Sequence, residues 1–219
     1  MSTSAQAVQT IADARLIVVL RYMSLDGLPE TATALREAGV RVVEVAMNSA
    51  QAVEQLHGLR ELGFCVGAGT ILAQEEAEKA ARAGAQFLFS PCRSPFFLPF
   101  CQQQGILGIA GGLTPTEIYS LSQQGCELIK LFPCVPFGPD YVRQILAPCP
   151  SLRLIPTGGV TLASAEEFLL AGAAAVAVGT EIANPGWVVA GRFDQIAERA
   201  HAFVAVAKRV RNMESSKAR

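Results

Sequence analysis

A single lysine interrupts one of the most apolar stretches of this chain. Lys130 is the only charged residue in the run from Leu128 to Pro133, which otherwise has the composition of a buried strand. Burial removes water from an ammonium group and thereby lowers its pKa. A lysine that is partly neutral near pH 7 can attack a carbonyl carbon as a nucleophile. The structural alternative is a lysine at a strand end whose amine reaches water.

A carboxylate stands in a similar setting earlier in the chain. Glu44 is the only charged residue in the run Val42–Ala46, which also has the composition of a core strand. Two isolated charges in separate core strands favour an arrangement in which they meet. A buried ion pair would be a purely structural outcome. The functional interpretation is that Glu44 carries protons for a reactive Lys130, with its pKa set by burial.

Glycines supply the third chemical signal. Gly158 and Gly159 follow one predicted strand, and Gly179 with Thr180 follows the next. Bare backbone amides at such positions bind phosphate in many barrels, although glycines also simply make tight turns. The segment Gly67–Thr70 would let the chain pass close to a small ligand, but it also fits an ordinary strand-to-helix turn. It lacks the third glycine of a dinucleotide fingerprint.

The elements that must position these residues alternate along the chain. Short apolar strands are separated by amphipathic helices, which commonly end at a glycine able to take the left-handed conformation. A helix over about 3–13 precedes the first strand, and a long one covers about 192–211. The pattern predicts an α/β fold, a compact (β/α)8 TIM barrel with an extra N-terminal helix, with a doubly wound open sheet as the alternative. The predicted strands are about 16–21, 41–46, 64–68, 86–90, 106–110, 127–132, 153–157 and 174–178.

Composition bounds what such a barrel can do. With 51% hydrophobic and 17% charged residues, the 219-residue chain can form a single domain, and a polar tail over 212–219 is expected to fray. A net charge of −1 without a basic stripe argues against nucleic acid. No apolar run has the ~18 residues that span a bilayer, and Met1–Asp13 does not resemble a signal peptide. Six scattered cysteines and two histidines indicate a cytoplasmic protein with no metal site.

Five motifs together resemble one enzyme family. Their order and spacing are similar to those of the 2-keto-3-deoxy-6-phosphogluconate aldolases over nearly the whole chain, from about Arg15 to Val178. That family also includes 4-hydroxy-2-oxoglutarate and 2-keto-3-deoxy-6-phosphogalactonate aldolases. The motifs are Val43–Ser49, Val66–Thr70, Phe89–Pro91, Ile129–Pro133 and Pro156–Val160.

The resemblance implies a class I aldolase that needs no cofactor and is commonly a homotrimer. Lys130 would form a Schiff base with the C2 ketone of a phosphorylated keto acid, and Glu44 would be the general acid and base, so that pyruvate and an aldehyde are released. The cluster Phe96, Phe97 and Phe100 indicates a helix that packs its apolar face, and exposed phenylalanines there would fit a subunit interface. The remaining site residues that the resemblance implies are Thr70, Pro91 and Phe132 in the pyruvate pocket, Thr157 near the carboxylate, and Gly158, Gly159, Gly179 and Thr180 at the phosphate.

One position departs from the common pattern of the family. Many phosphogluconate aldolases carry an arginine four residues after the glutamate, where this chain has Asn48. Together with Arg21 at the end of the first strand, this resembles the phosphogalactonate branch, and Arg21 would supply the cation for an anionic end of the substrate. Thr180 stands where a serine is usual. The competing hypotheses are a phosphosugar isomerase or epimerase and a non-catalytic barrel that binds a phosphorylated metabolite, neither of which needs Lys130.

Overall fold

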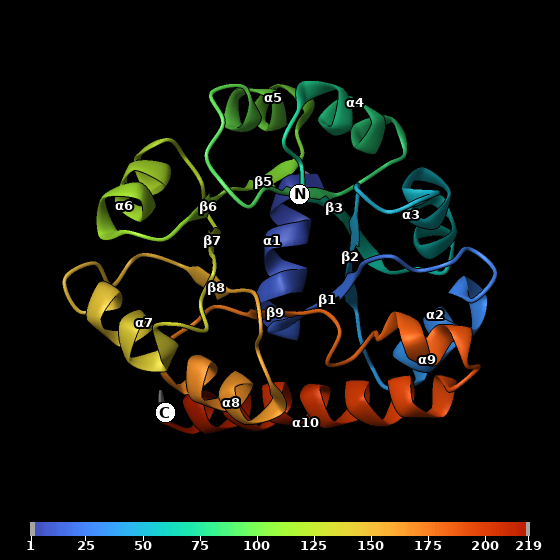
Figure 1. Ribbon diagram of the computed structural model, residues 1–219. Helices are drawn as coiled ribbons and strands as arrows, with labels where there is room; N and C mark the ends of the chain where they lie inside the picture. Colours follow the sequence, from blue (N-terminus) through green and yellow to red (C-terminus); the bar gives the residue numbers. More distant parts are fainter. Residues whose placement is uncertain (1–2, 218–219) are drawn as a thin grey trace.

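The computed structural model describes residues 3–217, and over this range parallel strands form a closed ring surrounded by helices (Figure 1). The strands are β1 (Leu16–Leu20), β2 (Val42–Ala46), β3 (Cys65–Gly69), β4 (Phe87–Phe89), β5 (Leu107–Ile109), β6 (Gly111–Gly112), β7 (Ile129–Leu131), β8 (Leu154–Pro156) and β9 (Val176–Val178). The helices are α1 (Thr3–Ala14), α2 (Leu28–Glu37), α3 (Ala52–Glu61), α4 (Gln74–Arg82), α5 (Phe97–Gln104), α6 (Pro115–Gln123), α7 (Gly138–Leu146), α8 (Leu162–Leu170), α9 (Pro185–Val189) and α10 (Phe193–Lys217).

The pairing of the strands closes the ring. One parallel sheet has the order β5-β4-β3-β2-β1-β9, and a second has the order β6-β7-β8. A parallel bridge between Thr157 and Ala177 joins β8 to β9. On the other side, β5 and β6 are two parts of one strand interrupted at Ala110, whose carbonyl accepts a hydrogen bond from Lys130 N–H at 3.0 Å. The predicted (β/α)8 barrel is therefore confirmed, and the open sheet is not formed.

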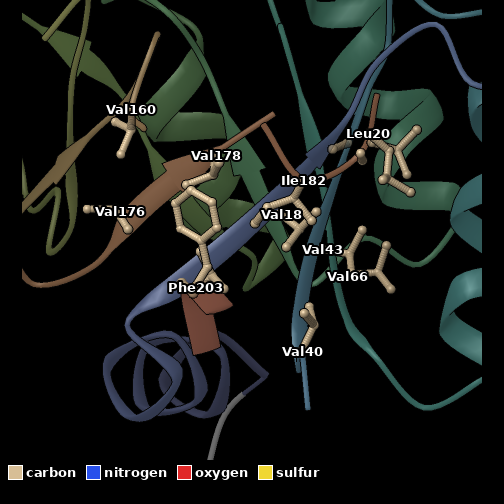
Figure 2. Close-up of a cluster of buried hydrophobic side chains, with 14 of the residues drawn as sticks. Val18, Leu20, Val40, Val43, Val66, Val160, Val176, Val178, Ile182 and Phe203 are labelled. Carbon is tan, nitrogen blue, oxygen red and sulfur yellow. The ribbon is translucent and has the colours of Figure 1, made fainter. Parts of the chain in front are cut away.

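Alternation along each strand separates two apolar layers. Residues such as Val18, Val43 and Val176 point outward and pack against the helices, where Phe203 of α10 meets them (Figure 2). Their neighbours in sequence point into the barrel, and this inner layer includes Phe87. Because successive side chains of a strand face opposite sides, a strand buried on both faces must be apolar almost throughout. That requirement makes Lys130 and Glu44 conspicuous in the sequence.

Helix α1 closes the amino-terminal end of the barrel. It lies at the centre of the ring of strands in Figure 1, and its residues Ala7, Val8 and Ile11 belong to the inner apolar layer. In this layer they are joined by residues near the beginnings of strands, including Ile17 and Val42. The extra N-terminal helix is thus confirmed, and it leaves only the carboxyl ends of the strands open to a ligand.

The C-terminal tail differs from the expectation. Helix α10 continues as far as Lys217, so the residues expected to fray from position 212 are helical up to that point, while 218–219 lie outside the described residues. An ion pair explains the difference, because Glu214 accepts a hydrogen bond from Arg15. Although α10 has 25 residues, no helix within residues 3–217 is long and apolar enough to cross a membrane.

The phenylalanine cluster forms the apolar helix face expected from the sequence, and this face packs against its own chain. Phe97 is fully buried, and Phe96 and Phe100 are partly buried side chains that pack against the core of their own chain. The sequence shows that these rings need an apolar neighbour, but it does not show whether that neighbour is the same chain. Their packing inside the subunit removes them as support for an interface.

We expect Ile11→Ala to destabilise the barrel without altering its open end. Ile11 is fully buried, so truncation leaves a cavity under the strands and should lower the free energy of unfolding by about 2–5 kcal/mol. Urea denaturation followed by circular dichroism measures this. Gln9→Ala on the exposed face of the same helix is the matched control and should cost less than about 0.5 kcal/mol. An equal loss of unfolding free energy in both variants would contradict the role of α1 in closing the amino-terminal end of the barrel.

Candidate active site

The carboxyl ends of the strands surround one cavity of about 450 Å³. This volume falls within the usual range for small-molecule sites. Apart from Asn48, all the predicted site residues line the cavity, together with Val19, Ala177 and Ala183, which the sequence interpretation missed. Val19 and Ala177 lie two positions before Arg21 and Gly179, so strand alternation could have identified them. The lining residues predicted from the sequence are Arg21, Glu44, Thr70, Pro91, Lys130, Phe132, Thr157, Gly158, Gly159, Gly179 and Thr180.

Lys130 extends from β7 into the cavity and is almost completely buried. Its Nζ lies 4.3 Å from the ring centroid of Phe89 and 5.0 Å from that of Phe132. The two rings exclude water, although their faces also attract a cation. Desolvation is the largest influence and lowers the pKa of Lys130, the nearby Arg21 lowers it further, and Glu44 opposes both. The position therefore favours the neutral amine that a nucleophilic lysine requires.

Glu44 faces the same cavity from β2 and is 1% exposed. Burial raises the pKa of its carboxyl, while Lys130 and Arg21 act in the opposite direction. Its Oε2 atom has no hydrogen-bond partner among the described residues, and no ion pair links Glu44 to Lys130 within that part of the chain. The buried ion pair that formed the structural alternative is thus not made. A carboxyl with a raised pKa holds a proton more readily than an ordinary glutamate, so it can donate a proton as well as accept one.

Glycines of β3 make room for the groups beside them. Gly69 pairs with Ala46 of β2, and the side chain of Glu44 reaches over Gly69, so that a β-carbon there would overlap the Glu44 carboxylate. A β-carbon at Gly67 would similarly overlap the ring of Phe87. From the sequence, these glycines could either let a ligand approach closely or form an ordinary strand-to-helix turn. The structure instead shows that Gly69 accommodates the carboxylate of the neighbouring strand.

Arg21 supplies a second cation at the end of β1. Its Nη2 donates a hydrogen bond to Thr70 Oγ1 at 3.2 Å, and Thr70 has a left-handed backbone with φ of 61°. Within residues 3–217, Arg21 forms no ion pair with a carboxylate. The guanidinium is therefore available to an anionic ligand. Asn48 lies outside the cavity lining, exposed, and its Nδ2 donates to the hydroxyl of Tyr22 at 3.3 Å.

The glycine turns after β8 and β9 form another part of the wall. Gly158 and Gly159 have φ of +92° and +75°, a region that favours glycine. A β-carbon at Gly158 would lie 3.0 Å from the Phe132 ring, and one at Gly159 would lie 2.6 Å from Val135. Side chains are excluded from both positions, so the backbone itself faces the cavity. Among the described residues, no group of three or more His, Cys, Asp or Glu side chains is placed to hold a metal ion.

A closed barrel with a dehydrated lysine and a dehydrated carboxyl at its mouth defines a class of protein, a barrel enzyme equipped for covalent catalysis by lysine. The sequence model of the aldolase family described as KDPG and KHG aldolase matches residues 8–199. The chain belongs to this family, whose enzymes are carbon–carbon lyases.

Two relatives and one solved structure illustrate the similarity. The chain is 30% identical to the 2-dehydro-3-deoxy-phosphogluconate aldolase of Treponema pallidum, over 83% of this chain and 88% of the relative. It is also 30% identical to the 2-dehydro-3-deoxy-6-phosphogalactonate aldolase of Escherichia coli, over 86% and 92%. The Legionella pneumophila KDPG aldolase, whose structure captured pyruvate as a covalent carbinolamine intermediate, superposes with a TM-score of 0.84 at 26% identity, covering 90% of this chain and 98% of that one.

We expect Gly69→Ala to abolish most activity through Glu44. The added methyl group must displace the carboxylate, and loss of a positioned general acid and base costs about 100-fold or more. Pyruvate release from KDPG, the substrate named in the family description, measures the effect. Gly58→Ala in α3 is the matched control, because its β-carbon would be at an ordinary 3.4 Å from Leu28. Full activity of Gly69→Ala would contradict this account of Glu44.

Proposed function

We propose that the protein is a class I aldolase that cleaves a 2-keto-3-deoxy-6-phospho sugar acid to pyruvate and glyceraldehyde 3-phosphate. The observation that carries the proposal is the dehydrated Lys130 beside the unpaired carboxyl of Glu44 in one cavity. Family membership supports the same chemistry. An isomerase, an epimerase or a non-catalytic binding barrel would not require a lysine inside β7.

The reaction begins with the attack of neutral Lys130 Nζ on the C2 carbonyl carbon. The carbonyl oxygen takes a proton as the carbinolamine forms, and Glu44 can deliver it. The attacking nitrogen then passes one of its two protons to the Glu44 carboxylate. Glu44 returns this proton to the carbinolamine oxygen, which leaves as water, and the product is an iminium with the positive charge on nitrogen. The raised pKa of Glu44 suits both steps, because the group must donate as well as accept protons.

Cleavage then uses the iminium as an electron sink. Glu44 removes the proton of the C4 hydroxyl, the C3–C4 bond breaks, and its electron pair moves towards the iminium to form an enamine. The C4 oxygen becomes the carbonyl of glyceraldehyde 3-phosphate, which leaves. Protonation of the enamine carbon and hydrolysis of the resulting imine release pyruvate and restore Lys130. The protons balance within the pair formed by Glu44 and water.

Binding of the substrate is assigned to the rest of the wall. We place the pyruvate half against Thr70, Pro91 and Phe132, with its carboxylate near Thr157 and Arg21. The phosphate would lie at the backbone amides of Gly158 and Gly159, with Gly179 and Thr180 beside them. Asn48, at the rim, would contact only a part of the substrate that extends from the cavity.

A second substrate could react by the same steps, from imine formation with Lys130 to release of pyruvate. 4-Hydroxy-2-oxoglutarate also presents a 2-keto acid to Lys130 and would yield pyruvate and glyoxylate, and the family description includes KHG aldolases. The gluconate and galactonate forms of the phosphorylated substrate differ in configuration at one carbon. The two relatives named for these forms are equally similar to this chain, at 30% identity each, so both substrates belong in the assay.

A homotrimer and a cytoplasmic location, within carbohydrate degradation of the Entner–Doudoroff type, complete the proposal. Apolar side chains remain exposed around the mouth of the barrel, including Leu72 after β3 and Val135 and Phe137 after β7. Covering them would favour association of subunits. The six cysteines are free thiols, as in a reducing compartment.

Trapping of the covalent intermediate tests the proposal directly. Incubation with pyruvate and borohydride should add one reduced pyruvyl group to the wild-type protein, because hydride converts the imine to a stable secondary amine. Intact mass spectrometry detects the adduct, and peptide mapping should place it on Lys130. Lys130→Ala should carry none while keeping its circular dichroism spectrum. An unmodified wild-type protein would refute the class I mechanism.

The pH dependence of trapping should follow the charges around Lys130. Its pKa is lowered, so the amine stays reactive at lower pH than an ordinary lysine, and the trapping rate should fall as pH drops through that pKa. Glu44→Gln removes a negative charge that raises the pKa and should move this fall to lower pH. Arg21→Ala removes a positive charge that lowers it and should move the fall to higher pH. Cyanoborohydride trapping at saturating pyruvate measures the midpoints, and shifts in the same direction would contradict the assignment.

A further inference from the structure

Ser49 is a buried serine that none of the proposed chemical steps uses. It lies in the turn after β2, the strand of Glu44, and is 7% exposed. Its N–H donates to the carbonyl of Ala46 at 2.9 Å, which holds the turn against the end of the strand. Its Oγ accepts a hydrogen bond from the backbone N–H of Tyr22 at 2.9 Å. The hydroxyl of Ser49 therefore connects the end of β2 to the segment that follows β1.

Tyr22 has an unusual backbone conformation at this point. Its φ is 56°, in the left-handed region that non-glycine residues seldom occupy. Such a conformation persists only where the surroundings hold it. The turn after β2 holds Tyr22 twice, since Ser49 accepts from its N–H and Asn48 donates to its hydroxyl. The Ser49 hydroxyl is the only group among the described residues that accepts a hydrogen bond from the Tyr22 N–H. Removing it would leave this N–H without an acceptor.

Arg21 directly precedes Tyr22 and depends on the same backbone. Its side chain lines the catalytic cavity and is held from the other side by Thr70, which accepts a hydrogen bond from Nη2. The planar guanidinium binds a carboxylate through two parallel N–H groups only when its orientation is right. Tyr22 and Thr70, which both have a left-handed backbone conformation, thus determine the direction of the Arg21 guanidinium.

The anionic group that Arg21 would meet follows from its neighbours. Arg21 lies close enough to Lys130 and Glu44 for its charge to affect the pKa of both. In a 2-keto acid bound to Lys130, the anionic group next to the reacting carbon is the carboxylate. A phosphate at the far end of the substrate would be several bonds away. Geometry therefore favours the keto-acid carboxylate as the partner of Arg21.

We propose that Ser49 is a positioning residue, whose hydrogen bond to the Tyr22 N–H fixes the backbone from which Arg21 reaches the substrate carboxylate. This inference rests on the proposed function, because it concerns how a 2-keto acid is held beside Lys130. It assigns to the Asn48–Ser49 turn a role in organising Arg21, in place of direct contact with the ligand. Affinity for the carboxylate, not the reactivity of Lys130, is then the property that Ser49 controls.

Cyanoborohydride trapping of two ketones separates these properties. Pyruvate carries the carboxylate, and methyl pyruvate presents the same ketone without a negative charge. Ser49→Ala should raise the half-saturating concentration of pyruvate about tenfold and leave its limiting trapping rate within twofold of wild type. The half-saturating concentration of methyl pyruvate should not change. Ser49→Thr, which keeps the hydroxyl, should bind pyruvate like the wild-type protein.

Two further variants decide whether Ser49 acts through Arg21. If it does, Ser49→Ala should have little additional effect on pyruvate in an Arg21→Ala background, since the two changes disable one contact. Thr31→Val is the matched control, because Thr31 is fully buried in α2 and its hydroxyl has no partner among the described residues. This control should leave both half-saturating concentrations unchanged.

The outcomes are distinct. Equal weakening of pyruvate and methyl pyruvate by Ser49→Ala, or additive effects with Arg21→Ala, would overturn the positioning role while leaving the aldolase proposal intact. Failure of Ser49→Thr to restore binding would also overturn it, provided that its unfolding midpoint matches the wild type. Absence of any adduct in the wild-type protein would contradict the proposed function and this inference with it.

Discussion

Burial removes water from Lys130 and from Glu44, and the cost of that dehydration governs how the barrel around them is arranged. In water a lysine at neutral pH is a cation and a poor nucleophile. Lys130 lies between the rings of Phe89 and Phe132, and there desolvation lowers its pKa more than the charge of Glu44 raises it. The same barrel interior shifts the pKa of Glu44 in the opposite direction. One environment therefore brings an acid and an amine towards the protonation states that imine chemistry needs.

The two ends of the barrel have different tasks because only one is closed. The inner layer near the strand beginnings is sealed by α1, so that no water enters from below. At the other end small residues replace large ones. Gly69 leaves room for the Glu44 side chain, and the glycine pair after β8 and the single glycine after β9 leave room for a ligand. The small residues at the carboxyl ends of the strands bury less apolar surface and so stabilise the fold less. The apolar layer at the amino-terminal end, which includes residues of α1, offsets this loss of stability.

A third charge completes the electrostatics of the cavity. Arg21 lowers the pKa of Lys130 and also counteracts the rise in the pKa of Glu44, so it favours a neutral lysine together with an ionised carboxyl. Its guanidinium is held by Thr70, and the backbone behind it is held by Ser49 through Tyr22. Binding of an anionic substrate would neutralise Arg21 and weaken both influences.

The sequence by itself determined the order of strands and helices, the helix ahead of them, and the two isolated charges that identify the site, and it favoured a barrel over an open sheet without deciding closure. These features are local or periodic, since strand alternation and a lone charge in an apolar run can be seen in a few residues. It also identified nearly all of the cavity lining, because the carboxyl ends of parallel strands must meet at one face. It did not predict the end of α10, which depends on an ion pair between Arg15 and Glu214, residues far apart in the chain.

Only the tertiary structure decided what each residue touches. In the structure, the lack of a side chain at Gly69 makes room for the Glu44 carboxylate. Asn48 contacts Tyr22 outside the cavity, and Phe97 is buried within its own chain. The tertiary structure also gave the hydroxyl of Ser49 a partner in the segment that follows the neighbouring strand β1. The physical reason is common to all four: register and rotamer across neighbouring strands and helices set these contacts, and neither is encoded in the residue types of a single segment.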